Sequence, residues 1–446
     1  MRAKFNELSD IQSFLEENEP SRISNNKNID LRECTFGFNL DINVLLSSLN
    51  YKYGNFENLC FRNSIFEFPV HLSLKKQTFI YDEKDKYQDC IYSNSKIEFS
   101  IDFSNSHFLD KVKFNGIEFQ EDIDFRNVVF ENEVELSELK FKKYIRLFES
   151  TFKSDVHFAN LEFNNKSIFF TNLNDRSKFE GNVYFFKVKF EEAKFWDFVF
   201  EKDVHFQNTI FNCPIFFNNA KFLGKTTFDS IETMGLTEFQ NKVYFDNAVI
   251  NNIEFNHLAF ENAVSFNYAI IKEISINNVY CYKSPLSLVG TKIDKVKDEG
   301  TARFLKSEAL KSNNAFLITE LNAKEMNLHF KQLKWKDQFF DKLIFLLNKI
   351  SNNFGQKWER GVLFIFLSWV LSFSLIILLR DGLGKTFIWL DKEYLREAMS
   401  YLWQFGSLDV LGKEFSLFDI LVFILGKTLI VYGIYQTIAA FRKYGK

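Results

Sequence analysis

The chain has 446 residues, 57 of them phenylalanine, and a formal net charge of −3, which argues against a bulk electrostatic attraction to nucleic acid. The rings must be buried, because an exposed apolar surface of that size would aggregate. The 5 cysteines are odd in number and none has a Cys-x-x-Cys spacing, which argues against a disulfide framework and a zinc knuckle. We expect the thiols to be buried or unreactive and the protein to lie in a reducing compartment.

The N-terminal segment, residues 1–28, starts MRAKFNELSDIQSFLEENEP and lacks the apolar core of a secretory signal peptide. We expect it to form a short polar helix that caps the following region. Without a signal peptide, that region is expected to stay in the cytosol.

Residues 29–282 carry a repeat that becomes regular at about residue 99, after a predicted loop at 72–98. Large apolar residues recur in steps of five and six, which fit neither the helical period nor the strand period. The residue two positions earlier is apolar or small, so each unit is locally extended and points two side chains inward. A fixed short period predicts a solenoid with a stacked aromatic core.

The expected core phenylalanines are Phe114, Phe119, Phe125, Phe130, Phe190, Phe195, Phe200, Phe206, Phe245, Phe255, Phe260 and Phe266, and the same run includes Phe216. A β-sandwich with irregular strands is the alternative, although a sandwich needs no step of five.

These units resemble those of the pentapeptide-repeat family, with a small residue at i−2 and Leu or Phe at i. The resemblance covers roughly residues 99–281, with weaker units at 58–61 and 64–66. It implies a mainly β fold, a right-handed quadrilateral β-helix. The six-residue steps depart from the family pattern, and we expect them to bulge a corner. With about 20–22 residues per coil, we expect the solenoid to have about ten coils.

Residues 283–356 are predicted to form a helical connector with a break at Asn313–Asn314. The segment 337–350 repeats apolar residues at helical spacing and carries charge on its other face. It is either an amphipathic helix on a membrane surface or a packed cytosolic helix.

Residues 357–446 are predicted to form a transmembrane hairpin. The uncharged segment 361–379 is long enough to span a bilayer, and the second candidate, 417–441, is interrupted by Asp419 and Lys427. Basic residues precede the first segment and follow the second, so both termini are expected in the cytosol and the loop 380–416 outside.

The C-terminal part resembles a group of bacterial pentapeptide-repeat membrane proteins whose hairpin is similar to the two-helix pore module of ion channels. The resemblance rests on Arg303, Lys306, Asn314, Glu325-Met326, SNNFG at 351–355 and YQTIAAFRKYGK at the end. It implies a protein of the bacterial inner membrane, in contact with lipid.

The segment 391–412 is predicted to form a short helix followed by a polar turn, which is the layout of a pore loop. Its pore candidates are Gln404, Gly406 and Ser407. It has no run like TVGYG, so potassium selectivity is not expected. The alternative is an amphipathic helix on the outer face.

Lys427 lies near the middle of the second segment, where a charge costs about 2.5–3.5 kcal/mol on insertion scales. It is expected to line a pore and disfavour cations, to snorkel, or to pair with a carboxylate on a neighbouring helix. Asp419 is the second intramembrane candidate. A stripe of small residues is suited to close helix packing: Gly426, Gly433, Thr437 and Ala440. Two spans cannot enclose a pore, so we expect a homo-oligomer through the hairpin.

Nucleotide-binding, metalloprotease and hydrolase motifs are absent from the sequence, and His107, His157 and His205 are too far apart to share a metal. We therefore expect no enzyme activity, no catalytic residue, no cofactor, no metal and no nucleic-acid partner. Two functions remain open. One is an oligomeric, ion-channel-like protein, and the other is a membrane-tethered scaffold that binds a cytosolic protein and does not conduct.

Overall fold

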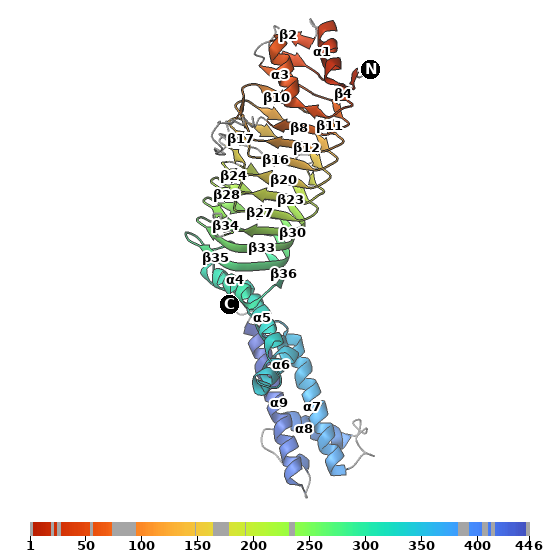
Figure 1. Ribbon diagram of the computed structural model, residues 1–446. Coiled ribbons are helices and arrows are strands. Elements are labelled where there is room, and N and C mark those ends of the chain that lie inside the picture. The colour runs from red at the N-terminus through yellow and green to blue at the C-terminus, as the bar shows by residue number, and fades with distance from the viewer. Residues whose placement is uncertain are drawn as a thin grey trace, which may run out of the picture. The chain divides into compact units, whose positions relative to one another are not determined.

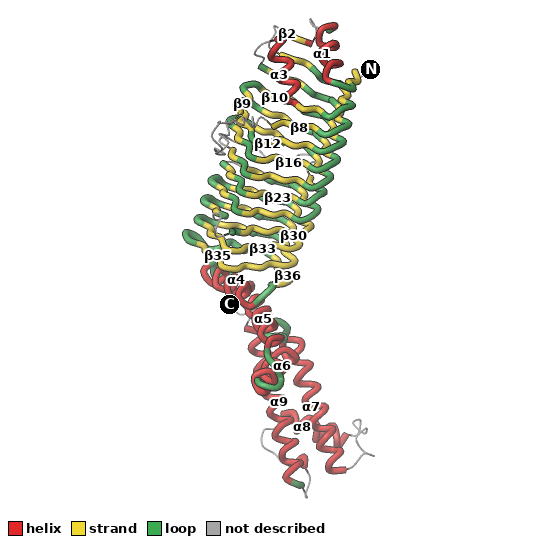
Figure 2. The backbone as a smooth tube through the Cα atoms, in the orientation of Figure 1, coloured by secondary structure: helices red, strands yellow, loops and turns green. Residues whose placement is uncertain are grey.

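The computed structural model describes residues 3–18, 22–24, 28–53, 57–73, 95–147, 149–163, 178–191, 193–231, 237–381, 392–403, 409–411 and 415–442. The chain divides into two compact units (Figures 1 and 2). We call Met1–Lys297 the β domain and Asp298–Lys446 the helical domain.

The β domain consists of short strands that pair almost entirely in parallel, in sheets of 26, 6 and 4 strands within the described residues. The strands form four rows, and successive strands of each row lie side by side in Figure 1. The first row contains β1 (Ala3–Phe5), β4 (Cys34–Phe36), β7 (Ile65–Phe66), β11 (His107–Phe108), β15 (Val129–Phe130), β19 (Thr151–Phe152), β22 (Lys178–Phe179) and β26 (Val199–Phe200). The second contains β5 (Leu40–Asp41), β8 (Val70–Ser73), β12 (Val112–Asn115), β16 (Val134–Ser137), β20 (Val156–Ala159), β23 (Val183–Phe186) and β27 (Val204–Gln207).

The third row contains β9 (Ser95–Ile97), β13 (Ile117–Phe119), β17 (Lys140–Phe141), β21 (Glu162–Phe163), β24 (Lys189–Phe190), β28 (Ile210–Phe211) and β31 (Glu238–Phe239). Longer strands then join the rows: β30 (Lys221–Asp229), β33 (Val249–Phe260), β35 (Ile270–Cys281) and β36 (Lys292–Val296). The fourth row forms the two smaller sheets: β2 (Ile23–Ser24), β3 (Asn28–Asp30), β6 (Asn58–Cys60), β10 (Ser100–Asp102), β14 (Ile123–Asp124) and β18 (Ile145–Arg146), then β25 (Ala193–Lys194), β29 (Ile215–Phe216), β32 (Val243–Tyr244) and β34 (Val264–Ser265).

The repeat length of the β domain is 22 or 21 residues where no segment is inserted. Phe108 pairs with Phe130, and Phe130 pairs with Phe152, each 22 residues further along the chain, whereas Phe179 pairs with Phe200 after 21 residues. Two early turns are longer because they contain helices α1 (Leu8–Glu17) and α3 (Ile42–Tyr53). Parallel pairing at a nearly constant offset is compatible with a β-solenoid, as the five-and-six spacing predicts.

The core of the β domain holds four columns of inward side chains, one for each row. All the predicted core phenylalanines are buried, at no more than 2% exposure. Rings of the first column, from Phe36 to Phe222, stack with centroids 4.5–5.5 Å apart. This spacing is close to that of paired strands, so each ring lies on the ring of the preceding turn.

The corners of the coil differ between the two kinds of step. Left-handed residues recur every 11 positions from Asn105 to Asn160, with φ between 53° and 71° at Asn105, Gly116, Asn127 and Glu138. They fall in the five-residue steps, such as Phe103 to Phe108, whereas a register shift between Phe222 and Lys225 falls in a six-residue step, where we expected a bulge. A five-residue step has less chain to complete its corner, and a left-handed residue turns it tightly.

Three boundaries also differ from the prediction. Strand β1 pairs with β4, so the strand rows begin inside the predicted cap. Strands β8 and β9 shorten the predicted loop at 72–98, of which 74–94 lie outside the described residues. Strand β36 pairs with β35, so the rows extend past residue 282.

One core assignment is corrected as well. Phe217 is the inward residue at 0% exposure, while its neighbour Phe216 lies on the outer face and stacks on Tyr244.

The helical domain contains α4 (Glu299–Lys311), α5 (Ala315–Gln332), α6 (Phe339–Asn352), α7 (Trp358–Asp381), α8 (Lys392–Trp403), the 3₁₀ helix η3 (Asp409–Leu411) and α9 (Leu417–Phe441). The predicted break at Asn313–Asn314 separates α4 from α5, and the Asn314 side chain caps α5 by accepting from the Leu317 amide at 3.2 Å. Helices α7 and α9 lie side by side (Figure 2) and are both long and apolar enough to cross a membrane. Their outer faces expose large apolar side chains such as Leu371 and Leu417.

Candidate functional site

Helix α8 packs between the two apolar helices α7 and α9. Its residues Ala398 and Tyr401 are buried at 0% and 1% exposure. They belong to one apolar cluster with Phe373 on α7 and Phe423 on α9. The ring of Tyr401 contacts both of these phenylalanine rings, with centroid distances of 6.0 and 5.5 Å. The sequence predicted a helix in this segment, but neither the face that is buried nor the two helices that cover it.

The C-terminal end of α8 meets both apolar helices near their midpoints. The indole Nε1 of Trp369, halfway along α7, donates to the carbonyl oxygen of Ala398 at 2.8 Å. The Nζ of Lys427, roughly 15 Å along α9, donates to the carbonyl oxygen of Tyr401. Carbonyls in the last turn of a helix have no partner within the helix. Lys427 therefore satisfies one of these groups from a neighbouring helix.

Lys427 is half-buried and also lies against two aromatic rings. Its Nζ is 4.5 Å from the ring centroid of Tyr401 and 5.7 Å from that of Phe423. Both rings present cation–π contacts to the ammonium. These contacts are a backbone carbonyl and two rings, whereas a carboxylate was one of the expected partners.

The middle of α8 is held by Arg380, in the last turn of α7. Its guanidinium donates to Glu397 Oε2 and to the carbonyl oxygen of Val410 in η3, both at 3.0 Å. Together with Trp369 and Lys427, Arg380 ties the second half of α8 to the two long helices.

The small-residue stripe of α9 packs against α7 of the same chain. A Cβ on Gly433 would lie 2.7 Å from Ile365 Cγ1, and one on Gly426 would lie 2.5 Å from Ser372 Cβ. Ala440 is buried, and the Thr437 hydroxyl lies where a Cβ on Gly361 would fall, at 2.3 Å. The stripe therefore serves close helix packing, but within one hairpin. This corrects the expectation that the stripe joins two copies.

The remaining pore candidates divide into two groups. Asp419 forms a capping box with Ser416, whose backbone N–H donates to Asp419 Oδ2 at 2.6 Å, so it has a structural role at the start of α9. Gln404, Gly406 and Ser407 lie outside the described residues.

A buried amide cluster joins the end of α6 to α9 and was not predicted. Asn352 Nδ2 donates to Gln436 Oε1 at 2.6 Å, and Gln436 Nε2 donates to Asn348 Oδ1 at 2.7 Å. Asn352 and Gln436 are almost fully buried. A glutamine inside an otherwise apolar helix was the sequence signal that pointed to a buried partner.

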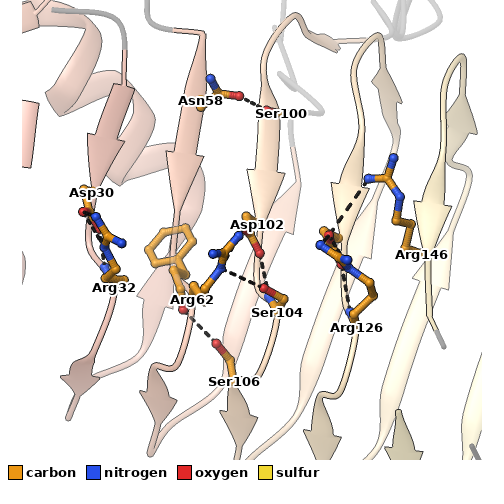
Figure 3. A network of polar contacts seen from close by, with 12 residues as sticks. Asp30, Arg32, Asn58, Arg62, Ser100, Asp102, Ser104, Ser106, Arg126 and Arg146 are labelled. Atoms are coloured by element: carbon orange, nitrogen blue, oxygen red, sulfur yellow. Dashed lines mark hydrogen bonds and ion pairs between the residues drawn. The ribbon is translucent and has the colours of Figure 1, made fainter. Parts of the chain in front are cut away.

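The fourth strand row of the β domain carries an outward ladder of arginines and aspartates (Figure 3). Strand pairing aligns four residues of this row in one column: Asp30, Cys60, Asp102 and Asp124. Arg62 donates to Asp102 at 2.6 Å, and Arg126 donates to Asp124 at 2.7 Å. These charges are already paired, which makes the ladder a self-neutralised surface.

Burial acts on the pKa of one carboxyl group in this ladder and of one thiol in the first strand row. Burial would raise the pKa of the Asp102 carboxyl, but hydrogen bonds from Ser104 and Arg62 outweigh it and hold the pKa below its usual range. Burial raises the pKa of the Cys34 thiol to about 12, so that thiol stays protonated and unreactive.

The histidines of the β domain give no metal site in the described residues, where no three or more His, Cys, Asp or Glu side chains gather. His157 stacks on Tyr184, which stacks on His205, with centroids 4.7 and 5.1 Å apart on the outer face. Burial against these neighbours lowers the pKa of His205.

Comparison of the chain with protein-family models, with curated proteins and with solved structures found no match.

Proposed function

We propose that the chain is a membrane-anchored pentapeptide-repeat protein. Its β domain is a right-handed quadrilateral β-helix in the cytosol, and its helical domain forms an oligomeric, ion-channel-like unit in the inner membrane of a bacterium. The repeat of 21 or 22 residues with four inward columns supports the first part. The two long apolar helices, with outer faces rich in exposed leucine and phenylalanine, support the second.

The observation that carries the proposed function is the position of the α8 C-terminus. Its Tyr401 carbonyl meets Lys427 near the midpoint of α9. In a bilayer, a helix that ended at this depth would leave carbonyls without water, so it is tolerated only where protein or a water-filled path surrounds it. A hairpin that only anchored the chain would need no helix of this kind. A half-length helix between two spans is the layout expected of an ion pathway.

Conduction requires several copies of the chain, because two long helices and one short helix cannot enclose a pore. The stripe of Gly426 and Gly433 is already used within the hairpin. We therefore assign the contacts between copies to the exposed apolar faces of α7 and α9, which include Phe366, Leu367 and Ile434. The same faces contact lipid.

Recording from the purified full-length protein in planar bilayers tests the proposed function. We expect discrete single-channel currents that persist over a range of voltage and salt. Protein in which α8 is deleted should give no such currents, because the half-depth helix is lost. Silent bilayers with demonstrably inserted parent protein would contradict channel function.

The alternative is a membrane-tethered scaffold, and the arginine–aspartate ladder favours it. The ladder borders a shallow cavity of about 240 Å³ that is lined by residues including Cys60, Asp102, Asp124 and Arg146. Such a polar face could bind a cytosolic protein. Silent bilayers together with a partner that is lost in an Arg146→Ala variant would support the scaffold.

A further inference from the structure

The C-terminal end of α8 has the features of a site for a positive charge. Aligned peptide dipoles place a partial negative charge at a helix C-terminus. Here the Tyr401 carbonyl oxygen faces the ammonium of Lys427. Helix α8 has 12 residues, enough for an established dipole.

The groups around this ammonium are those that also coordinate weakly hydrated monovalent cations. One is a backbone carbonyl oxygen, the ligand that replaces water in cation-selective filters. The others are the faces of Tyr401 and Phe423, with centroids 4.5 and 5.7 Å from Nζ. Aromatic faces attract ammonium and other monovalent cations through the ring quadrupole.

We propose that the C-terminal end of α8 is a monovalent-cation site whose resident occupant is the tethered ammonium of Lys427. This inference rests on the proposed function, because it places the site on the ion pathway. Lys427 then excludes free monovalent cations by occupying their position and by its charge. Removing its side chain leaves the carbonyl and the two rings to receive a potassium-like or alkylammonium ion.

The position of Lys427 supports an occupant role over snorkelling. Its ammonium bonds a carbonyl near the midpoint of the long helices, whereas a snorkelling lysine extends toward the aqueous boundary. Phe423 lies one turn before Lys427 on α9, so the ring and the ammonium share a face that Tyr401 covers.

Thallium flux into proteoliposomes that contain the full-length protein tests the proposal. Lys427→Ala should raise Tl⁺ influx at least about tenfold over the parent. Lys427→Arg keeps the charge and should behave as the parent does. Thr428→Ala, at the exposed neighbouring position, should also leave influx unchanged. Added n-butylammonium, which resembles the lost side chain, should block the Lys427→Ala variant.

A binding measurement separates the site from conduction. Line broadening of ²⁰⁵Tl in detergent should report Tl⁺ binding to Lys427→Ala and not to the parent. Binding without flux in any variant would support the cation site and contradict the channel. Equal flux in the parent and Lys427→Ala, with equal binding, would overturn the cation site and leave the channel standing. Lys427→Met supplies the same comparison if the alanine variant does not fold.

Discussion

At the scale of single residues, asparagine is the commonest residue at the left-handed corners of the β domain. Left-handed φ is strained for most side chains, and asparagine tolerates it best after glycine. Asn105 and Asn127 occupy equivalent corners of successive turns, and Asn127 Nδ2 donates to Asn105 Oδ1 at 2.7 Å. One residue type thus fits the backbone angle and links neighbouring turns through its side chain.

The adjacent residues Phe216 and Phe217 give a matched test of the core. Phe217→Ala should cost about 3–5 kcal/mol of unfolding free energy, because it empties a fully buried position between Phe195 and Phe245. Phe216→Ala loses an outer-face stack on Tyr244 and should cost about 1 kcal/mol. Urea unfolding of the full-length protein, followed by pulse proteolysis, measures both. Equal costs would contradict the inward and outward assignment.

The sequence pattern predicted most inward residues of the β domain, but it failed where two phenylalanines are adjacent. A step of five or six leads equally well to Phe216 or Phe217, and only strand pairing decides between them. The pattern also did not locate the left-handed corners, which fall in the five-residue steps. Spacing gives the length of chain between inward residues, but not the φ that the chain adopts on the way.

At the scale of elements, α9 depends on α7 for its packing. Gly433→Leu would place a branched side chain where a Cβ already falls 2.7 Å from Ile365 Cγ1. We expect a cost of about 1–3 kcal/mol and a lower melting temperature of the helical domain in detergent. Thr428→Ser, at an exposed position of α9 outside the proposed contacts between copies, should leave the melting temperature unchanged.

The oligomeric state of the same variants distinguishes the two places where the stripe could act. Because Gly433 contacts α7 of its own chain, Gly433→Leu should destabilise the fold before it separates copies. A Gly433→Leu protein that melts as the parent does but runs as a monomer would return the stripe to an interface between chains.

The hairpin site was predictable from the sequence only in part. Helical periodicity and length located α7, α8 and α9. They did not show that Trp369 and Lys427 would meet carbonyls of α8, because an apolar face does not specify which helix covers it. Gln436 in an apolar helix signals a buried polar partner, but no local pattern could identify that partner as Asn352, because the two residues lie far apart in the chain.

At the scale of the whole molecule, the chain combines a unit with a closed aromatic core and a unit with apolar outer faces. The β domain buries its large rings in four columns, whereas α7 and α9 expose leucine and phenylalanine over their length. Exposed apolar area of this extent needs lipid or other chains to cover it. The two units should therefore differ in solubility.

Fractionation of expressing cells tests this difference and the proposed topology together. Full-length protein should stay in the membrane pellet after alkaline carbonate washing, whereas residues 1–297 alone should be soluble. The two apolar segments are flanked on one side by Lys357, Arg360 and Arg442, which predicts that both termini lie in the cytosol. Fluorescent-protein fusions at either terminus should therefore fluoresce, and alkaline phosphatase fusions there should be inactive. Carbonate would release the full-length chain if α7 and α9 were core helices of a soluble assembly. An active phosphatase at the C-terminus would instead mean that only one of the two helices crosses the membrane.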